Sequence, residues 1–218
     1  MRRLVLLVLA STLLSGIFPL EAQTRRKAPV RKPPAPALKV EAASITCPSV
    51  LGRGARTHLE YCDVLIGRNP ADGIHIKIPP RDGTAYVSFL LHNRHTFSEE
   101  EVRARRAYAR YTAVVGLLTT AGDLLDRGAV QSEFFAEKDL YERIEGGAGP
   151  RGLKAVAPIG AEQVRIEVPD AKVTEVSLLG EKLTVTKGDQ TATYTIVGTP
   201  IASVSNIKVE YRPKKLKR

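Results

Sequence analysis

The sequence is poor in aromatic and sulfur-containing residues. It has no Trp, one Met and two Cys among its 218 residues, and aromatic residues make up only 6% of the chain. Modules that bind sugars commonly stack them on aromatic rings, so this composition disfavours a flat stacking platform. Tyr108 and Tyr111 lie among Arg105, Arg106 and Arg110 and could form a mixed contact surface. A solvated helix face is the simpler interpretation of that cluster.

Several short catalytic motifs are also missing. The sequence has neither the GxSxG elbow of many serine hydrolases nor the HExxH of zinc peptidases, and its glycine-rich segment 145–152 lacks the GK[ST] ending of a phosphate loop. The candidates for a metal site are His75, His92 and His95, whose spacing matches no zinc motif. We therefore predict a protein that is not an enzyme and uses no cofactor. A periplasmic metal-dependent enzyme built on these histidines is the alternative.

The two cysteines, Cys47 and Cys62, are separated by 14 residues. In an exported chain such a pair most simply forms one disulfide. A loop of this size would stabilise the fold by roughly 3 kcal/mol. A catalytic Cys is disfavoured, because a thiolate nucleophile normally stands alone beside a His that acts as its base.

Residues 1–22 have the features of a secretory signal peptide. Arg2 and Arg3 precede an apolar stretch over residues 4–20, and small Ala22 can occupy the last position before cleavage. An uncleaved membrane anchor is the alternative, since the apolar run reaches the lower limit for a membrane helix. Residues 23–43 follow as a proline-containing basic linker that should be extended. We therefore expect an exported protein, periplasmic or extracellular.

The net charge of +10 is concentrated in two segments. Residues 1–22 contribute +1, residues 23–40 contribute +6 and residues 211–218 contribute +5, which leaves −2 for residues 41–210. Such basic segments bind anionic polymers by counterion release and anionic lipid headgroups by electrostatic attraction. The simpler alternatives are that the N-terminal basic segment is a spacer and that the C-terminal one is a solubilising tail. The residues predicted to contact an anionic polymer are Arg25, Arg26, Lys27, Arg31, Lys32, Arg212, Lys214, Lys215, Lys217 and Arg218.

Residues 161–211 alternate between apolar and polar side chains with a period of two. The clearest runs are 164–168, 183–186 and 207–211, separated by turn sequences such as Lys187-Gly188-Asp189. This pattern is typical of half-buried strands, and the short regular spacing favours an antiparallel sandwich. Further strands are expected over 57–66, 74–78, 84–91 and 111–120.

Helices are expected to be few. Ser98 followed by Glu99, Glu100 and Glu101 is a capping box that predicts a helix from there to about residue 109. Residues 121–127 are interpreted as a turn or short helix, and residues 134–144 as a short helix.

Together these patterns predict a mainly β protein: an antiparallel β-sandwich, Ig-like or jelly-roll-like, with one or two short helices. The expected division is a signal peptide at 1–22, a linker at 23–43, the sandwich domain at 44–212 and a basic tail at 213–218. The predicted function is a non-catalytic binding or structural module of the bacterial cell envelope or extracellular space. Its partners would be an anionic envelope polymer or lipid headgroups, and a protein or its own copies, with nucleic acid disfavoured. A carbohydrate-binding module is a further alternative.

Overall fold

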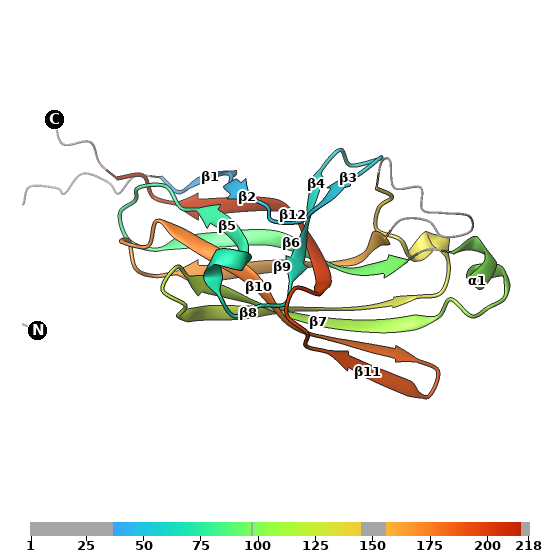
Figure 1. Cartoon of the computed structure of the whole chain (residues 1–218). Coiled ribbons are helices and arrows are strands. Elements are labelled where there is room, and N and C mark those ends of the chain that lie inside the picture. The colour runs from blue at the N-terminus through green and yellow to red at the C-terminus, as the bar shows by residue number, and fades with distance from the viewer. Residues whose placement is uncertain (1–36, 97, 145–155, 215–218) are drawn as a thin grey trace, which may run out of the picture. The chain divides into compact units, whose positions relative to one another are not determined.

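The computed structural model describes residues 37–96, 98–144 and 156–214. The predicted signal peptide, most of the predicted linker and the glycine-rich segment 145–152 lie outside the described residues. The described part consists of two antiparallel sheets packed on a common core (Figure 1), which confirms the predicted β-sandwich.

The first sheet, called sheet A, has the strand order β3-β4-β12-β6-β9, with β1 also paired to β12. The second, sheet B, has the order β2-β5-β10-β7-β8, with β11 also paired to β10. Sheet A is formed by β1 (Lys39–Ala42), β3 (Val50–Arg53), β4 (Glu60–Leu65), β6 (Ala85–Thr96), β9 (Val156–Val168) and β12 (Pro200–Tyr211). Sheet B is formed by β2 (Ser44–Thr46), β5 (Ile74–Lys77), β7 (Ala109–Thr119), β8 (Leu124–Phe134), β10 (Glu175–Lys187) and β11 (Gln190–Tyr194).

Alternation along each strand builds the core between the sheets. In β6 the fully buried Val87, Phe89 and Leu91 point toward sheet B, and Val115 and Leu117 of β7 meet them from the other side. A smaller cluster around Tyr111, Phe134 and Ile159 fills one end of the sandwich. Burial of these side chains supplies the main favourable term for the fold.

The row of β6 side chains that faces sheet B ends in polar residues. Asn93 donates from its amide nitrogen to the carbonyl oxygens of Tyr111 and Val130 and to Oγ of Ser132, at 3.2, 3.3 and 2.8 Å. These acceptors belong to β7 and β8. A strand of sheet A is therefore hydrogen-bonded directly to sheet B.

The helix start at Ser98 is confirmed, but the predicted length is wrong. Ser98 Oγ accepts from the backbone N–H of Glu101 at 3.3 Å, and α1 (Glu99–Arg103) ends after five residues. The chain reverses through Arg105, whose φ is 56°, and β7 begins at Ala109. The strand propensity of the apolar run that follows outweighs the helical pattern of the arginines.

The helix over 134–144 and the helical option for 121–127 are also wrong. The turn ends near Gly122, and β8 runs from Leu124 to Phe134. Asp139 accepts from the N–H groups of Phe135 and Ala136 at 2.7 and 2.8 Å, which leaves only the 3-10 turn η2 (Glu137–Asp139). Side-chain to backbone bonds of this kind compete with a continuing helix. A second 3-10 turn, η1 (Pro70–Asp72), precedes β5.

Candidate functional site

The first and last strands of the body lie next to each other. β1 pairs antiparallel with the end of β12, and the register places Lys39 opposite Tyr211 and Ala42 opposite Lys208. In an antiparallel pair, the chain before the first strand and the chain after the second leave at the same end. The two basic segments are therefore attached side by side (Figure 1). We call this region the terminal corner; it comprises Lys39, Glu41, Arg81, Tyr211 and Arg212.

Side chains of β1 and β12 hold the terminal corner together. The buried Tyr211 donates from its hydroxyl to Glu41 Oε1 at 2.8 Å, and Lys39 forms an ion pair with the same carboxylate. The Lys39 ammonium also lies 5.8 Å from the centre of the Tyr211 ring. The hydrogen bond to Glu41 raises the pKa of Lys39, and Lys39 in turn lowers the pKa of Glu41.

The chain that follows β12 is held in place by the buried Arg81. The backbone carbonyl oxygen of Arg212 accepts from the backbone N–H of Asp82 at 3.0 Å, and Arg81 forms a β-bridge with Pro213. Arg81 is 4% exposed, and its guanidinium donates to the carbonyl oxygens of Val173 and Asp170 at 2.7 and 2.6 Å. Burial lowers the pKa of Arg81. This side chain ties the end of β12 to the turn between β9 and β10.

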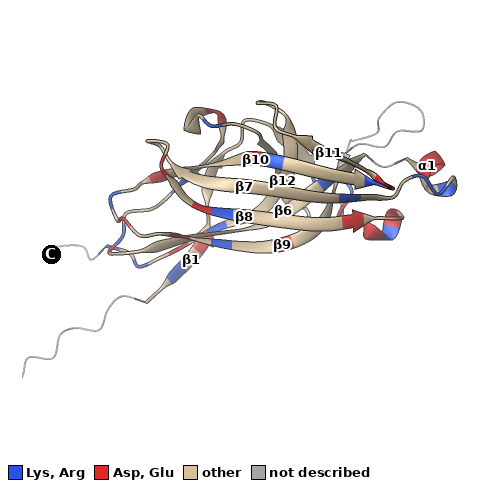
Figure 2. Cartoon of the chain, turned by 90° about the horizontal axis from the view of Figure 1, so that it is seen from below, with Lys and Arg blue, Asp and Glu red and all other residues tan. Residues whose placement is uncertain are grey.

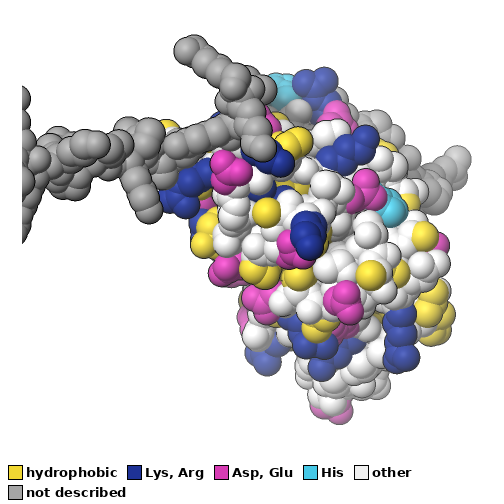
Figure 3. Space-filling model, turned by 90° about the vertical axis from the view of Figure 1, so that its left-hand side faces the viewer, with side chains coloured by type: hydrophobic (Ala, Val, Ile, Leu, Met, Phe, Trp, Pro, Cys, Tyr) yellow, Lys and Arg dark blue, Asp and Glu magenta, His cyan; other side chains and the backbone are white. Residues whose placement is uncertain are grey.

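Basic side chains of the body are widely paired with acidic ones. These pairs are Lys39–Glu41, Asp63–Arg94, Glu101–Arg106, Arg110–Glu133, Arg127–Glu181, Glu137–Arg143 and Arg165–Glu210. Figure 2 shows the two signs of charge interspersed along the strands, and Figure 3 shows the same mixture on the end of the body that carries the terminal corner. Exposed pairs add little stability, but they leave no extended field of one sign on these faces.

Two of the residues predicted to contact an anionic polymer are described. Arg212 and Lys214 are both exposed and follow directly on β12. Arg25, Arg26, Lys27, Arg31, Lys32, Lys215, Lys217 and Arg218 lie outside the described residues. β1 begins at Lys39, inside the segment that the sequence pattern assigned to the linker.

The structure does not bring the three candidate metal ligands together. His75 lies on β5, where Nδ1 is 2.8 Å from Glu175 Oε1 and Nε2 is 3.2 Å from the carbonyl oxygen of Ala71. The Ala71 carbonyl, followed by Glu175, raises the pKa of His75. His92 and His95 point to opposite faces of β6, as their spacing predicts for an extended strand. The described residues contain no group of His, Cys, Asp or Glu arranged to hold a metal ion.

His95 faces sheet B and packs against the smaller core cluster. Its ring stacks on Phe134 at a centroid distance of 3.7 Å, and its Nδ1 lies 2.5 Å from the hydroxyl of Tyr111. Burial lowers the pKa of His95 to about 4 and raises that of Tyr111 to about 12. Tyr111 is therefore an inward-facing residue and does not join Tyr108 in an exposed surface; Tyr108 instead contacts Phe135 at 4.6 Å.

His92 and Ser205 form a buried pair that the sequence did not signal. His92 Nε2 lies 3.0 Å from Ser205 Oγ, and its Nδ1 lies 2.6 Å from the carbonyl oxygen of Gly160. An oriented His beside a Ser is the arrangement of an activated serine nucleophile. Here His92 is 0% and Ser205 1% exposed, beneath the rings of Tyr61 and Tyr141. The pair is therefore a buried polar link between β6 and β12 in this conformation.

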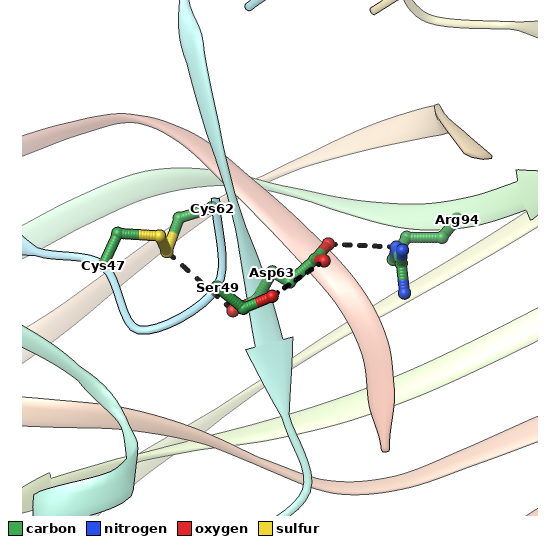
Figure 4. The surroundings of a disulfide bond; sticks show 5 residues. All are labelled: Cys47, Ser49, Cys62, Asp63 and Arg94. Carbon is green, nitrogen blue, oxygen red and sulfur yellow. Dashed lines mark hydrogen bonds and ion pairs between the residues drawn. A yellow bond between two sulfur atoms is a disulfide. The ribbon is translucent and has the colours of Figure 1, made fainter. Parts of the chain in front are cut away.

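The predicted disulfide is present and joins the two sheets (Figure 4). Cys47 directly follows β2 of sheet B, and Cys62 lies in β4 of sheet A, with their Cα atoms 5.9 Å apart. Next to it, Asp63 accepts from Ser49 Oγ at 3.3 Å and lies 3.0 Å from Arg94 Nε. That Nε–Oδ1 contact is an ion pair without the alignment of a hydrogen bond, since neither atom has a hydrogen-bond partner among the described residues.

No protein family model and no curated protein sequence matches this chain. Among solved structures, it is similar to the VP2 subviral particle of infectious bursal disease virus, with a TM-score of 0.30 and 10% sequence identity. That match covers 82% of this chain and 34% of the viral chain, so the chain spans about a third of the length of its counterpart. So distant a likeness supports no conclusion about function. Among the described residues, the helix is too short and too polar to cross a membrane.

Proposed function

We propose that this protein is an exported, non-catalytic β-sandwich that serves as a binding or structural module of the bacterial cell envelope or extracellular space. Its two basic segments act together as one tether to an anionic polymer or lipid surface. The observation that carries this proposal is the terminal corner, where Lys39 lies opposite Tyr211. It attaches two basic segments, separated by about 170 residues of chain, at neighbouring strands.

Shared attachment makes the two segments more effective than either alone. Once one segment is bound, the other is already held close to the same surface, which raises its effective concentration. Each basic residue near an anionic membrane contributes about 1 kcal/mol, so several from each segment are needed for stable attachment. Because positive and negative charges are interspersed on the body, we assign the attraction to anionic surfaces to the two basic segments.

The disulfide between Cys47 and Cys62 supports export. Disulfides persist in oxidising compartments and are rare in the bacterial cytosol. The predicted signal peptide at residues 1–22 agrees with this compartment.

The test is binding of residues 23–218 to vesicles with and without phosphatidylglycerol, and to polyphosphate, over a series of salt concentrations. Three charge-neutralised forms are compared: the N-terminal segment alone, the tail alone and both. In the first, Arg25, Arg26, Lys27, Arg31 and Lys32 become Gln; in the second, Lys214, Lys215, Lys217 and Arg218 become Gln. These substitutions leave β1 and the Arg81–Pro213 bridge intact.

We expect binding that weakens steeply with salt, that falls with either neutralised segment and that is lost when both are neutralised. The matched control replaces five exposed basic residues elsewhere on the body with Gln and should bind nearly as well as the parent; they are Arg68, Arg103, Arg105, Lys138 and Lys182. If the control loses as much affinity as the neutralised segments, or if the parent binds neither probe at low salt, the proposal is wrong.

A further inference from the structure

The β10–β11 hairpin ends sheet B in an uncovered strand. β11 pairs with β10 in unbroken register from Leu183–Tyr194 to Lys187–Gln190, and all five of its residues are exposed. Among the described residues, no strand pairs with its other side. Figure 1 shows the hairpin projecting from the side of the body, with β11 at its outer edge.

The other edge strands of the two sheets are protected by features that β11 lacks. β8 carries Asp126, Arg127 and Glu133, and β9 carries Glu162, Arg165 and Glu167. β1 includes Lys39 and Glu41, β3 is interrupted by a register shift between Val50 and Gly52, and β2 is only three residues long. Charges, bulges and short length all hinder pairing with another chain.

β11 has the sequence Gln190-Thr191-Ala192-Thr193-Tyr194, with no charge and no proline. Its backbone donors and acceptors on the free side are therefore open to a further strand.

Apolar side chains continue the surface beyond the strand. Tyr194, Ile196 and Val197 are 42%, 72% and 69% exposed. On the face of the hairpin that carries Val185, Ala192 and Tyr194, a groove of about 540 Å³ remains open, and Lys187 and Gln190 also line it. An uncharged edge beside exposed apolar groups is the composition of a contact surface.

We propose that β11 pairs antiparallel with β11 of a second copy of this chain, about a two-fold axis at Ala192. A two-fold interface uses the same surface on both copies, so that residue i of one copy contacts residue j of the other and j contacts i, and an uncharged strand can meet its own copy in this way. In this register Ala192 lies opposite its own copy, Thr191 opposite Thr193 and Gln190 opposite Tyr194. No charge opposes a charge, and the Thr pairs are favourable cross-strand neighbours. The two copies of sheet B become one continuous sheet.

The interface is small, because five residues pair on each side, and it therefore forms only at high protein concentration. The hairpin turn lies at the far end of β10 from the terminal corner, about 40 Å away for a strand of 13 residues. A chain held at a surface by its basic segments thus keeps β11 free, and its high local concentration favours pairing. The pairing itself does not depend on that tether.

The first test is sedimentation of residues 23–218 over a range of concentrations at about 0.15 M salt, with and without charged substitutions at Ala192. The parent should dimerise reversibly. Ala192→Lys and Ala192→Glu should each weaken dimerisation by about tenfold or more, because like charges then lie opposite each other. An equimolar mixture of the two should recover the dimer. A monomeric parent, or a dimer that Ala192→Lys leaves unchanged, overturns the proposal.

The second test traps the register with a disulfide. Ala192→Cys should crosslink two copies under mild oxidation, because directly opposed residues lie about 4.5–5.5 Å apart. The matched control is Gln131→Cys, an exposed position on β8 at the other edge of sheet B. Equal rates of crosslinking for the two variants would contradict pairing through β11. Circular dichroism of each variant shows whether the sandwich is retained.

Discussion

Lys39 and Tyr211 are paired residues of β1 and β12, although 171 positions separate them in the chain. Between them runs the whole sandwich. Because of this pairing, the chain enters and leaves the body at one corner, so two basic segments that are remote in sequence are attached to neighbouring strands. The alternation of apolar and polar residues does not determine which strands pair, so the sequence alone could not reveal this arrangement.

The hydroxyl of Tyr211 should secure β1 to the body. Tyr211→Phe removes its hydrogen bond to Glu41 and should reduce the free energy of unfolding by about 1 kcal/mol. Amide hydrogen exchange in β1 should accelerate more than exchange in β6 or β7. Tyr194→Phe, at an exposed tyrosine whose hydroxyl has no hydrogen bond to the described residues, is the control and should change neither quantity. Unchanged exchange in β1 would show that the hydroxyl does not hold this strand.

Loss of the disulfide should destabilise the body without changing its fold. The paired substitution Cys47→Ser and Cys62→Ser should lower the free energy of unfolding by about 2–4 kcal/mol, because the unfolded chain regains the freedom of the closed loop. Urea titration of the variant, and of the parent with and without reductant, measures this. The reduced parent should resemble the variant. A variant as stable as the oxidised parent would show that the link between the sheets is redundant.

Loss of one partner of the Asp63–Arg94 ion pair should destabilise the fold, whereas replacement of both partners should not. Burial raises the pKa of Asp63 and lowers that of Arg94 despite their mutual attraction, so loss of water outweighs the contact for both groups. Asp63→Ala should cost about 3 kcal/mol, because the charged and largely enclosed Arg94 then loses its ion-pair partner. The double variant Asp63→Leu, Arg94→Met should regain most of that stability or exceed the parent. If the double variant is as unstable as Asp63→Ala, the polar pair is required for the fold itself.

His95 should make the fold sensitive to acid. Its pKa is about 4 in the folded state and close to 6.5 in an unfolded chain, so the unfolded state binds the proton first as the pH falls. Stability from this group is complete above about pH 6.5 and is lost between about pH 6.5 and pH 4, to a total of about 3 kcal/mol. His95→Phe should flatten the dependence of unfolding free energy on pH in that window. His75→Gln, at a half-exposed histidine whose pKa is shifted in the opposite direction, should not.

The sequence predicted the strands that are half exposed and failed where other interactions decide the structure. The alternating runs at 164–168, 183–186 and 207–211 all lie in observed strands, namely β9, β10 and β12. β8 was missed because its inward positions include Gly128 and Ser132, which weaken the apolar period. The segment after it resembled a helix, but Asp139 bonds the preceding backbone and ends it as a turn.

The candidate site was predictable in part. Composition located the basic residues, and the cysteine count predicted the disulfide that the structure contains. The roles of His92 and His95 could not be predicted, because each depends on partners from other strands, such as Ser205 and Tyr111. The same holds for Arg81, a buried arginine whose acceptors are backbone carbonyl groups of a distant turn.

The most direct measurement uses a variant in which the charges of the basic tail are transferred to another part of the body, so that the net charge stays the same. In one variant Lys214, Lys215, Lys217 and Arg218 become Gln, and the sequence Lys-Lys-Leu-Lys-Arg is inserted between Gly188 and Asp189, about 40 Å away along β10. Affinity for phosphatidylglycerol vesicles is compared with that of the parent and of the tail-neutralised chain at equal salt. If the two segments act as one tether at the terminal corner, the relocated tail should bind no better than the neutralised one. Affinity equal to that of the parent would show that net charge suffices and that the shared corner has no role.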